Sequence, residues 1–97
     1  MLQDDISEYF NKRLDFNLET KINQTLKIDN LNFDKVYHKF SHKHRLIYGV
    51  GIFLDLNRCF TFYNTPNPNN ATTTMVKESK VIYTMEEVLD FIDKWSD

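Results

Sequence analysis

The stretch YHKFSHKHRLIYG at residues 37–49 concentrates side chains that can do chemistry: three histidines, two lysines and one arginine. His38 and His42 are four residues apart, the spacing at which two imidazoles on one helix face can bind zinc, with His44 or Cys59 as a third ligand. The third ligand is not well defined, because His44 would fall on a different face of a continuing helix. The pattern is more typical of solvated histidines, and we expect no metal site and no cofactor.

Metal-free RNA cleavage is a second chemistry that these residue types permit. One histidine would act as the base and another as the acid, while Lys39, Lys43 or Arg45 would stabilise the charge of the transition state. The acid and the base must lie on opposite sides of the scissile phosphate, and histidines within one short segment are poorly placed for that. We therefore predict no catalytic residue, and a small histidine-dependent ribonuclease is the third hypothesis of function.

The same segment has the composition of a nucleic-acid contact. Within residues 35–48, Lys39, Lys43 and Arg45 alternate with rings such as Tyr37, as phosphate-binding cations alternate with stacking side chains in nucleic-acid-binding proteins. With Lys35, the segment has four cations, which would neutralise only about four phosphates, and this predicts modest, salt-sensitive affinity. A nucleic-acid-binding regulator that uses residues 35–48 is the second hypothesis.

Motifs of the common enzyme classes are missing from the sequence. It contains no G-x-x-x-x-G-K-[ST], G-x-S-x-G, G-x-G-x-x-G or C-x-x-C pattern, so nucleotide hydrolysis, serine esterase chemistry and dinucleotide redox have no support. Cys59 stands alone within an apolar stretch, where a cysteine usually serves as a small core residue. We expect the protein not to be an enzyme.

Four carboxylates near the C-terminus recur in steps of four, three and four residues: Glu86, Asp90, Asp93 and Asp97. These steps place them on one face of a helix, and such a face is usually the solvated one. Asp93 and Asp97, however, lie toward the helix end where the macrodipole disfavours negative charge. We predict that this stripe binds a partner, together with four residues of the basic segment: Lys39, Lys43, Arg45 and Tyr37.

The sequence patterns around these residues predict helices and strands that form a single α+β domain covering residues 1–97. Thr84 and Glu87 form a T-x-x-E capping box ahead of an amphipathic helix over 85–95, and Asp5 and Glu8 are a weaker cap pair for a helix over about 5–14. Apolar β-branched and aromatic runs at about 45–56 and 59–64 predict an antiparallel hairpin. A third strand at 80–83 completes a three-stranded sheet packed by the two helices.

Three details of this expected fold depend on local signals. Asn57 and Arg58 predict a tight hairpin turn that places Leu56 opposite Cys59, with Phe53 opposite Phe62. Residues 17–40 carry mixed periodicity, and we expect a second helix there, with a strand as the alternative. The Asn-, Pro- and Thr-rich residues 64–74 predict an exposed polar loop.

Composition and charge place the chain among small globular proteins. The 97 residues are 41% hydrophobic and 14% aromatic, and the formal net charge of −2 is too small for bulk attraction to nucleic acid or membrane. Locally the charge is uneven: residues 1–34 sum to −3, 35–80 to +5 and 81–97 to −4. One cysteine, no leader-like start and no long apolar run favour a soluble cytoplasmic protein without membrane contact.

The leading hypothesis of function is a small non-enzymatic inhibitor that binds a host or cognate protein through its charged surface. The AT-rich codon usage implied by many Asn, Lys, Ile, Phe and Tyr residues suggests a phage or mobile element of a low-GC bacterium. Such a protein would block a nucleic-acid-handling or defence machine, as anti-CRISPR and other anti-defence proteins do, and a toxin-immunity protein is a close variant. Complementary charge and a few aromatic anchors are the features that such binding requires.

Overall fold

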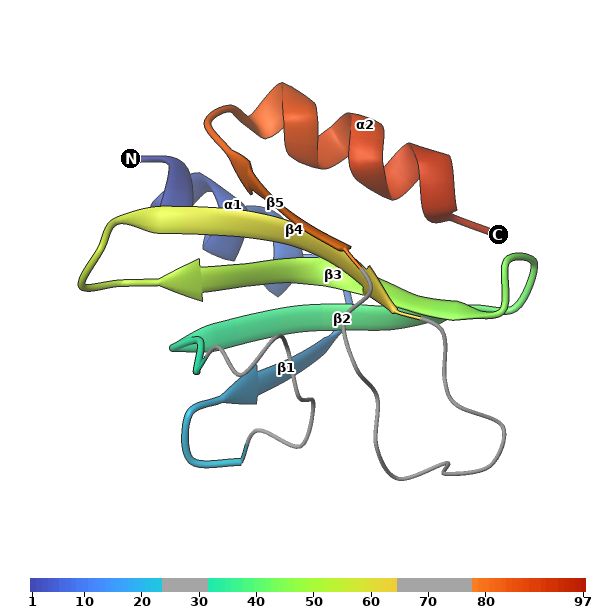
Figure 1. Cartoon of the computed structure of the whole chain (residues 1–97), viewed down its shortest axis with the longest axis horizontal. Coiled ribbons are helices and arrows are strands. Elements are labelled where there is room, and N and C mark those ends of the chain that lie inside the picture. The colour runs from blue at the N-terminus through green and yellow to red at the C-terminus, as the bar shows by residue number, and fades with distance from the viewer. Residues whose placement is uncertain (24–31, 65–77) are drawn as a thin grey trace.

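The computed structural model describes residues 1–23, 32–64 and 78–97, which fold into a five-stranded antiparallel sheet and two helices (Figure 1). The strands lie in the sheet in their sequence order, β1 to β5. Along the chain the elements are α1 (Leu2–Asn11), β1 (Asn17–Thr20), β2 (Lys35–Ser41), β3 (Leu46–Phe53), β4 (Arg58–Asn64), β5 (Glu78–Ile82) and α2 (Met85–Trp95). The α+β class and the terminal helices are confirmed, and the sheet has two more strands than predicted.

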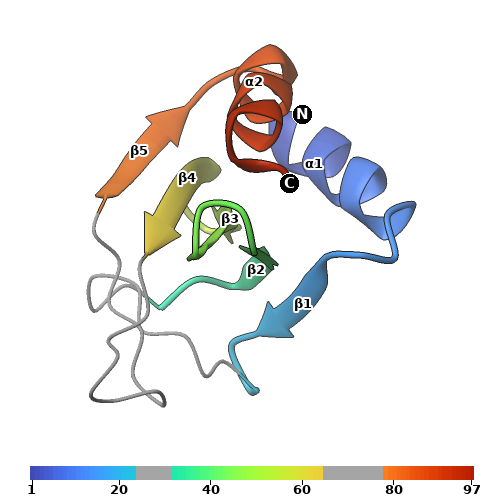
Figure 2. The same ribbon diagram turned by 90° about the vertical axis from the view of Figure 1, so that its right-hand side faces the viewer.

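Both helices pack on the same face of the sheet (Figure 2). Because side chains alternate along a strand, every second residue of β3 points toward the helices, and Tyr48, Val50 and Ile52 form the centre of this core. They pack in one cluster with Ile6 of α1 and Val88 of α2, all of them buried. We refer to this side as the helix face.

The opposite face of the sheet carries a smaller buried cluster of Phe33, Val36 and Phe62. Gly51 makes room for it, since a Cβ atom at this position would lie 2.8 Å from ring atoms of Phe33. Gly49 has the same role toward the backbone, because its Cβ would overlap the carbonyl oxygen of Tyr37. Both glycines therefore permit a close approach that a larger residue would prevent.

The two helices differ in how they begin. In α2 the predicted capping box is present: Thr84 Oγ1 accepts from Glu87 N at 3.2 Å, and Glu87 Oε1 accepts from Thr84 N at 3.1 Å. In α1 the predicted cap is wrong, because the helix starts at Leu2 after Met1 and Asp5 lies within its first turn. The helix also ends at Asn11, short of the predicted end at Leu14, and the Leu14 side chain is 98% exposed.

The predicted register of the β3–β4 hairpin is wrong by four residues. Phe53 pairs with Arg58, and residues 54–57 form a four-residue turn in which Asn57 N donates to Leu54 O at 3.2 Å. Asn57 adopts a positive φ of 50°, which asparagine tolerates better than most residues. A shift of four keeps the inward and outward sets of side chains unchanged, so the predicted faces hold although the pairs do not.

The helix expected within residues 17–40 is also wrong, and the strand alternative is correct for the described part. Residues 17–20 and 35–41 form β1 and β2, in which Leu18 pairs with Tyr37. Strand β2 pairs along its whole length with β3, and these long-range hydrogen bonds override the weak helical periodicity. Residues 24–31 lie outside the described residues, as does the predicted polar loop from residue 65 onward.

Candidate functional site

The predicted basic segment is divided between two faces of the sheet and a turn. Lys39 lies on the helix face of β2, whereas Lys43 and Arg45 belong to the turn between β2 and β3. Tyr37 is only 3% exposed, and its ring stacks on Phe10 with 4.8 Å between centroids. The predicted contact role of Tyr37 is therefore corrected: alternation in β2 turns its ring into the core.

The three histidines diverge from one another. His38 Nε2 lies 3.7 Å from Glu19 Oε1 on the face away from the helices, and burial lowers the pKa of His38 while Glu19 partly offsets this. His42 packs edge-on against Phe40, and His44 packs edge-on against Trp95. Within residues 1–23, 32–64 and 78–97, no group of three or more His, Cys, Asp or Glu side chains is placed to hold a metal ion.

Asp97 lies apart from the other three carboxylates of the predicted stripe. It follows the end of α2 and binds the β2–β3 turn, where Oδ1 accepts from Ser41 Oγ at 3.0 Å and from Lys43 N at 2.7 Å. The backbone hydrogen bond from Lys43 is the main cause that lowers the pKa of Asp97. This carboxylate joins the C-terminus to the sheet.

Ser41, His44 and Asp97 thus lie close together, as the members of a hydrolytic triad do, but their hydrogen bonds follow a different pattern. The Asp97 carboxylate binds the serine hydroxyl, whereas in a triad it would orient the imidazole. Ser41 is fully buried, and its Oγ accepts from His44 N at 3.2 Å within the turn. The arrangement satisfies the polar groups of a turn and leaves no exposed nucleophile.

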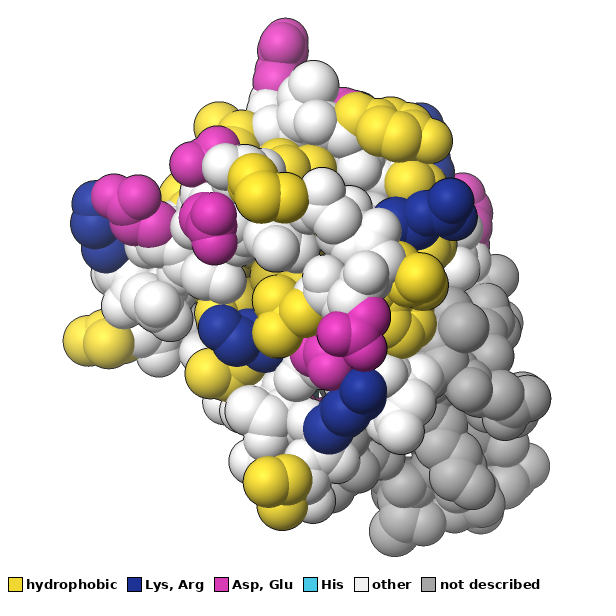
Figure 3. All heavy atoms as spheres, turned by 90° about the vertical axis from the view of Figure 1, so that its left-hand side faces the viewer, with side chains coloured by type: hydrophobic (Ala, Val, Ile, Leu, Met, Phe, Trp, Pro, Cys, Tyr) yellow, Lys and Arg dark blue, Asp and Glu magenta, His cyan; other side chains and the backbone are white. Residues whose placement is uncertain are grey.

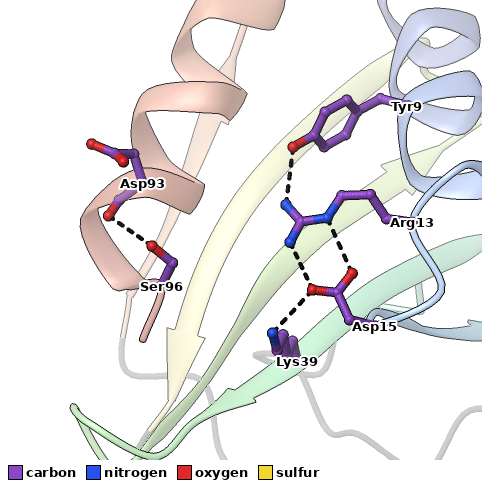
Figure 4. A network of polar contacts seen from close by, with 6 residues as sticks. All are labelled: Tyr9, Arg13, Asp15, Lys39, Asp93 and Ser96. Carbon is purple, nitrogen blue, oxygen red and sulfur yellow. Dashed lines mark hydrogen bonds and ion pairs between the residues drawn. The ribbon is translucent and has the colours of Figure 1, made fainter.

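A second polar cluster ties the end of α1 to β2 (Figure 4). Arg13 donates to Asp15 through Nη2 at 2.7 Å and to Tyr9 Oη through Nη1 at 3.0 Å, while Lys39 Nζ lies 3.0 Å from Asp15 Oδ2. Asp15 therefore forms ion pairs with two cations at once. The ammonium group of Lys39, predicted to bind a partner, is engaged within the chain.

Asp15 makes the stability of the fold depend on pH. The Arg13 guanidinium is the main cause that lowers the pKa of Asp15 from 3.8 to about 2. A carboxyl with a depressed folded-state pKa stabilises the fold above its unfolded pKa and loses this contribution as the pH falls toward 2. We expect Asp15→Asn to cost about 1 kcal/mol at pH 7, since the partly exposed pair is screened by solvent.

Urea unfolding of both proteins at pH 7, 4 and 2 measures this contribution. The difference in free energy of unfolding between wild type and Asp15→Asn should shrink between pH 4 and pH 2. Asp55→Asn, at an exposed carboxylate that forms no ion pair with a described residue, is the control. A difference in free energy of unfolding between wild type and Asp15→Asn that stays constant with pH would contradict the pH-dependent role of Asp15.

The other three predicted carboxylates, Glu86, Asp90 and Asp93, share the exposed side of α2 and are called the acidic ridge below. None of them lies within 4.0 Å of a cationic group of the described residues. The carboxylate of Asp93 points away from the cluster around Arg13 (Figure 4). Leu89 lies among them and is 44% exposed, so the ridge combines unpaired negative charge with apolar surface.

A groove of about 410 Å³ lies beside the ridge, between α2 and the helix face of β4 and β5. We call it the β5 groove; its lining residues include Tyr63, Glu78, Lys80, Asp90, Lys94 and Trp95. Tyr63 and Trp95 form an aromatic wall with 5.0 Å between ring centroids, and Tyr63 Oη donates to Glu78 Oε2 at 2.8 Å. Periodicity does not reveal this groove, because its walls come from three separate elements.

No protein-family model, curated protein or solved structure matches this chain. Within the described residues, neither helix is long and apolar enough to cross a membrane.

The end of the molecule on the left-hand side of Figure 1 lacks a comparable single-sign surface. Acidic, basic and hydrophobic side chains are interspersed there, and no histidine is visible (Figure 3). The exposed Leu54 and Leu56 of the β3–β4 turn are separated by Asp55 and followed by Arg58. The acidic ridge and the β5 groove are the more promising features.

Proposed function

We propose that this chain is a non-enzymatic protein-binding inhibitor that contacts its partner through the acidic ridge. The observation that carries the proposal is the set of three exposed carboxylates on one side of α2 that form no ion pair with a described residue. Unpaired like charges on one helix repel one another, so a cationic partner relieves this repulsion and is attracted over a distance. Exposed Leu89 adds apolar area at the centre of the ridge.

A nucleic-acid-handling protein is the kind of partner that this surface fits. Such proteins carry clusters of lysine and arginine where they contact phosphates, and a row of carboxylates presents the same sign of charge as a phosphate backbone. This likeness in charge and the AT-rich codon usage implied by the amino-acid composition support a phage or mobile-element protein. Such a protein would act in the cytoplasm against a defence machine, in the manner of anti-CRISPR or toxin-immunity proteins. The partner is then held by surface complementarity without any bond-breaking step.

Direct binding to nucleic acid receives less support from the site. Of the predicted contacts in residues 35–48, Tyr37 is buried and Lys39 is paired with Asp15. Lys43 and Arg45 remain in the turn, where Asp97 lies against the Lys43 backbone. We expect the purified protein not to shift short RNA or DNA duplexes in a gel at 150 mM salt.

Charge reversal tests the ridge directly. The variant Glu86→Lys/Asp90→Lys/Asp93→Lys should weaken partner binding about 10- to 100-fold, because three attractive contacts become repulsive. The matched control, Asp4→Lys/Asp5→Lys/Glu8→Lys, makes the same change of net charge on exposed residues of α1. Partners are captured on the immobilised wild-type chain from a lysate of a low-GC bacterium, identified by mass spectrometry, purified and then titrated against each variant.

Circular dichroism must first show that both variants keep the fold. Full binding by the ridge variant, or equal loss in both variants, would contradict the assignment of the ridge. RNA or DNA binding that is abolished by Lys39→Glu/Lys43→Glu/Arg45→Glu would support the nucleic-acid hypothesis instead.

A further inference from the structure

Strand β5 forms one edge of the sheet. It pairs with β4 on one side and is the last strand in the order, so in the described part of the chain its other side has no neighbouring strand (Figure 2). The backbone N–H and C=O groups along such an edge can pair with an added strand. Main-chain hydrogen bonds then supply affinity, and pockets for alternate side chains supply specificity.

The β5 groove is placed to receive the side chains of such a strand. Its floor includes Glu78 and Lys80, which point to the helix face of β5, and α2 forms its far wall. An added strand would direct every second side chain toward this same face. A volume of about 410 Å³ is ample for one long side chain with part of its neighbour.

The aromatic wall of the groove already binds a cation. The Nζ atom of Lys94 lies 5.0 Å from the centroid of the Trp95 ring, within the range of a cation–π contact. Lys94 is an exposed side chain, and it forms no ion pair with a described carboxylate that would hold it there. A guanidinium group stacks on such rings better than an ammonium group does and can take its place.

The charges around the wall favour a basic occupant. Three carboxylates line the groove against two ammonium groups, and the ridge adds two further carboxylates alongside. Glu78 uses one oxygen to accept from Tyr63, and its other oxygen forms no hydrogen bond with a described residue. That oxygen is available to a cation lying against the Tyr63 ring.

We propose that the β5 groove binds an extended basic segment of the partner protein, which adds to the edge of β5 and places an arginine against the Tyr63–Trp95 wall. This inference rests on the proposed function, since it names the part of the partner that the same surface recognises. The ridge would attract the partner by charge, and the groove would hold its extended segment.

The probe is an acetylated and amidated pentapeptide of alternating valine and arginine, titrated into the ¹⁵N-labelled full chain. We expect saturable shifts of the β5 amide resonances, a five- to tenfold weaker affinity for Glu78→Lys, and less than a twofold change for Glu8→Lys on α1. Methylating alternate backbone nitrogens of the peptide should also weaken binding at least fivefold, because it removes donors of a strand pair. A peptide with glutamate in place of arginine should not bind.

The outcomes separate this inference from the proposed function. Absence of peptide binding, or binding that Glu78→Lys leaves unchanged, would overturn the inference. If Glu86→Lys/Asp93→Lys abolishes peptide binding while Glu78→Lys does not, the ridge alone is the contact and the groove is not used. If the peptide shifts β5 but the ridge variant still binds the captured partner fully, the proposed role of the ridge fails instead.

Discussion

Gly49→Ala is expected to destabilise the fold by about 3 kcal/mol or more. A Cβ atom at Gly49 would overlap the carbonyl oxygen of Tyr37 and lie 2.9 Å from the Cα atom of His38. Both are backbone atoms of the adjacent strand β2, so no side-chain rotation can relieve the clash. The strands must separate locally, with loss of pairing at the centre of the sheet.

Gly51→Ala is the matched control for this substitution. Its added Cβ would lie 2.8 Å from ring atoms of Phe33, and a ring can tilt where a backbone cannot. We expect a smaller loss, about 1 to 2 kcal/mol. Urea unfolding followed by tryptophan fluorescence and circular dichroism measures both, and a Gly49→Ala protein as stable as wild type would show that β2 and β3 approach less closely than described.

Phe10→Ala is the second substitution with a large expected effect, a loss of about 3 to 5 kcal/mol. The Phe10 ring is buried and contacts three other rings, with centroids at 5.1 Å for Tyr9 and 4.8 Å for both Phe16 and Tyr37. Its removal leaves a cavity between α1 and the sheet and loses the stacked contact with β2. Such a loss is a large part of the stability of a domain of this size.

Leu14→Ala is the control that shows whether the loss in Phe10→Ala comes from buried packing or from the removal of any apolar side chain. Leu14 is an apolar residue close to Phe10 in sequence, but it is 98% exposed. We expect its substitution to change the free energy of unfolding by less than about 0.5 kcal/mol. Thermal and urea unfolding of the two variants compare them, and similar losses for both would contradict the described packing of α1.

The fold changes what the charge pattern of the sequence means. The basic middle segment, residues 35–80, is partly neutralised within the chain, since Lys39 pairs with Asp15 of the N-terminal segment. The acidic C-terminal segment loses Asp97 to the β2–β3 turn but keeps the three ridge carboxylates exposed. Of the predicted charged surface, the ridge carboxylates and the turn residues Lys43 and Arg45 therefore stay exposed without an ion pair to a described residue, and the ridge is the larger of the two groups.

Local patterns determined α2 and the faces of the central hairpin. The capping box joins Thr84 to Glu87, three residues away, and the apolar spacing of Val88 and Ile92 follows from a single helical turn. Alternation along β3 likewise depends only on neighbouring residues, so the sequence predicts which hairpin side chains share a face even where the register is wrong. These features required no information about distant parts of the chain.

Tertiary structure alone decided the rest, because the contacts involved join residues far apart in sequence. Lys39 meets Asp15 across 24 residues, and Ser41 meets Asp97 across 56. Strand β2 forms because β1 and β3 supply hydrogen bonds on both of its sides. The β5 groove forms because α2 packs over β4 and β5, and the local sequence pattern of these elements does not predict that arrangement. Which charges remain unpaired is a property of that packing, and the candidate site follows from it.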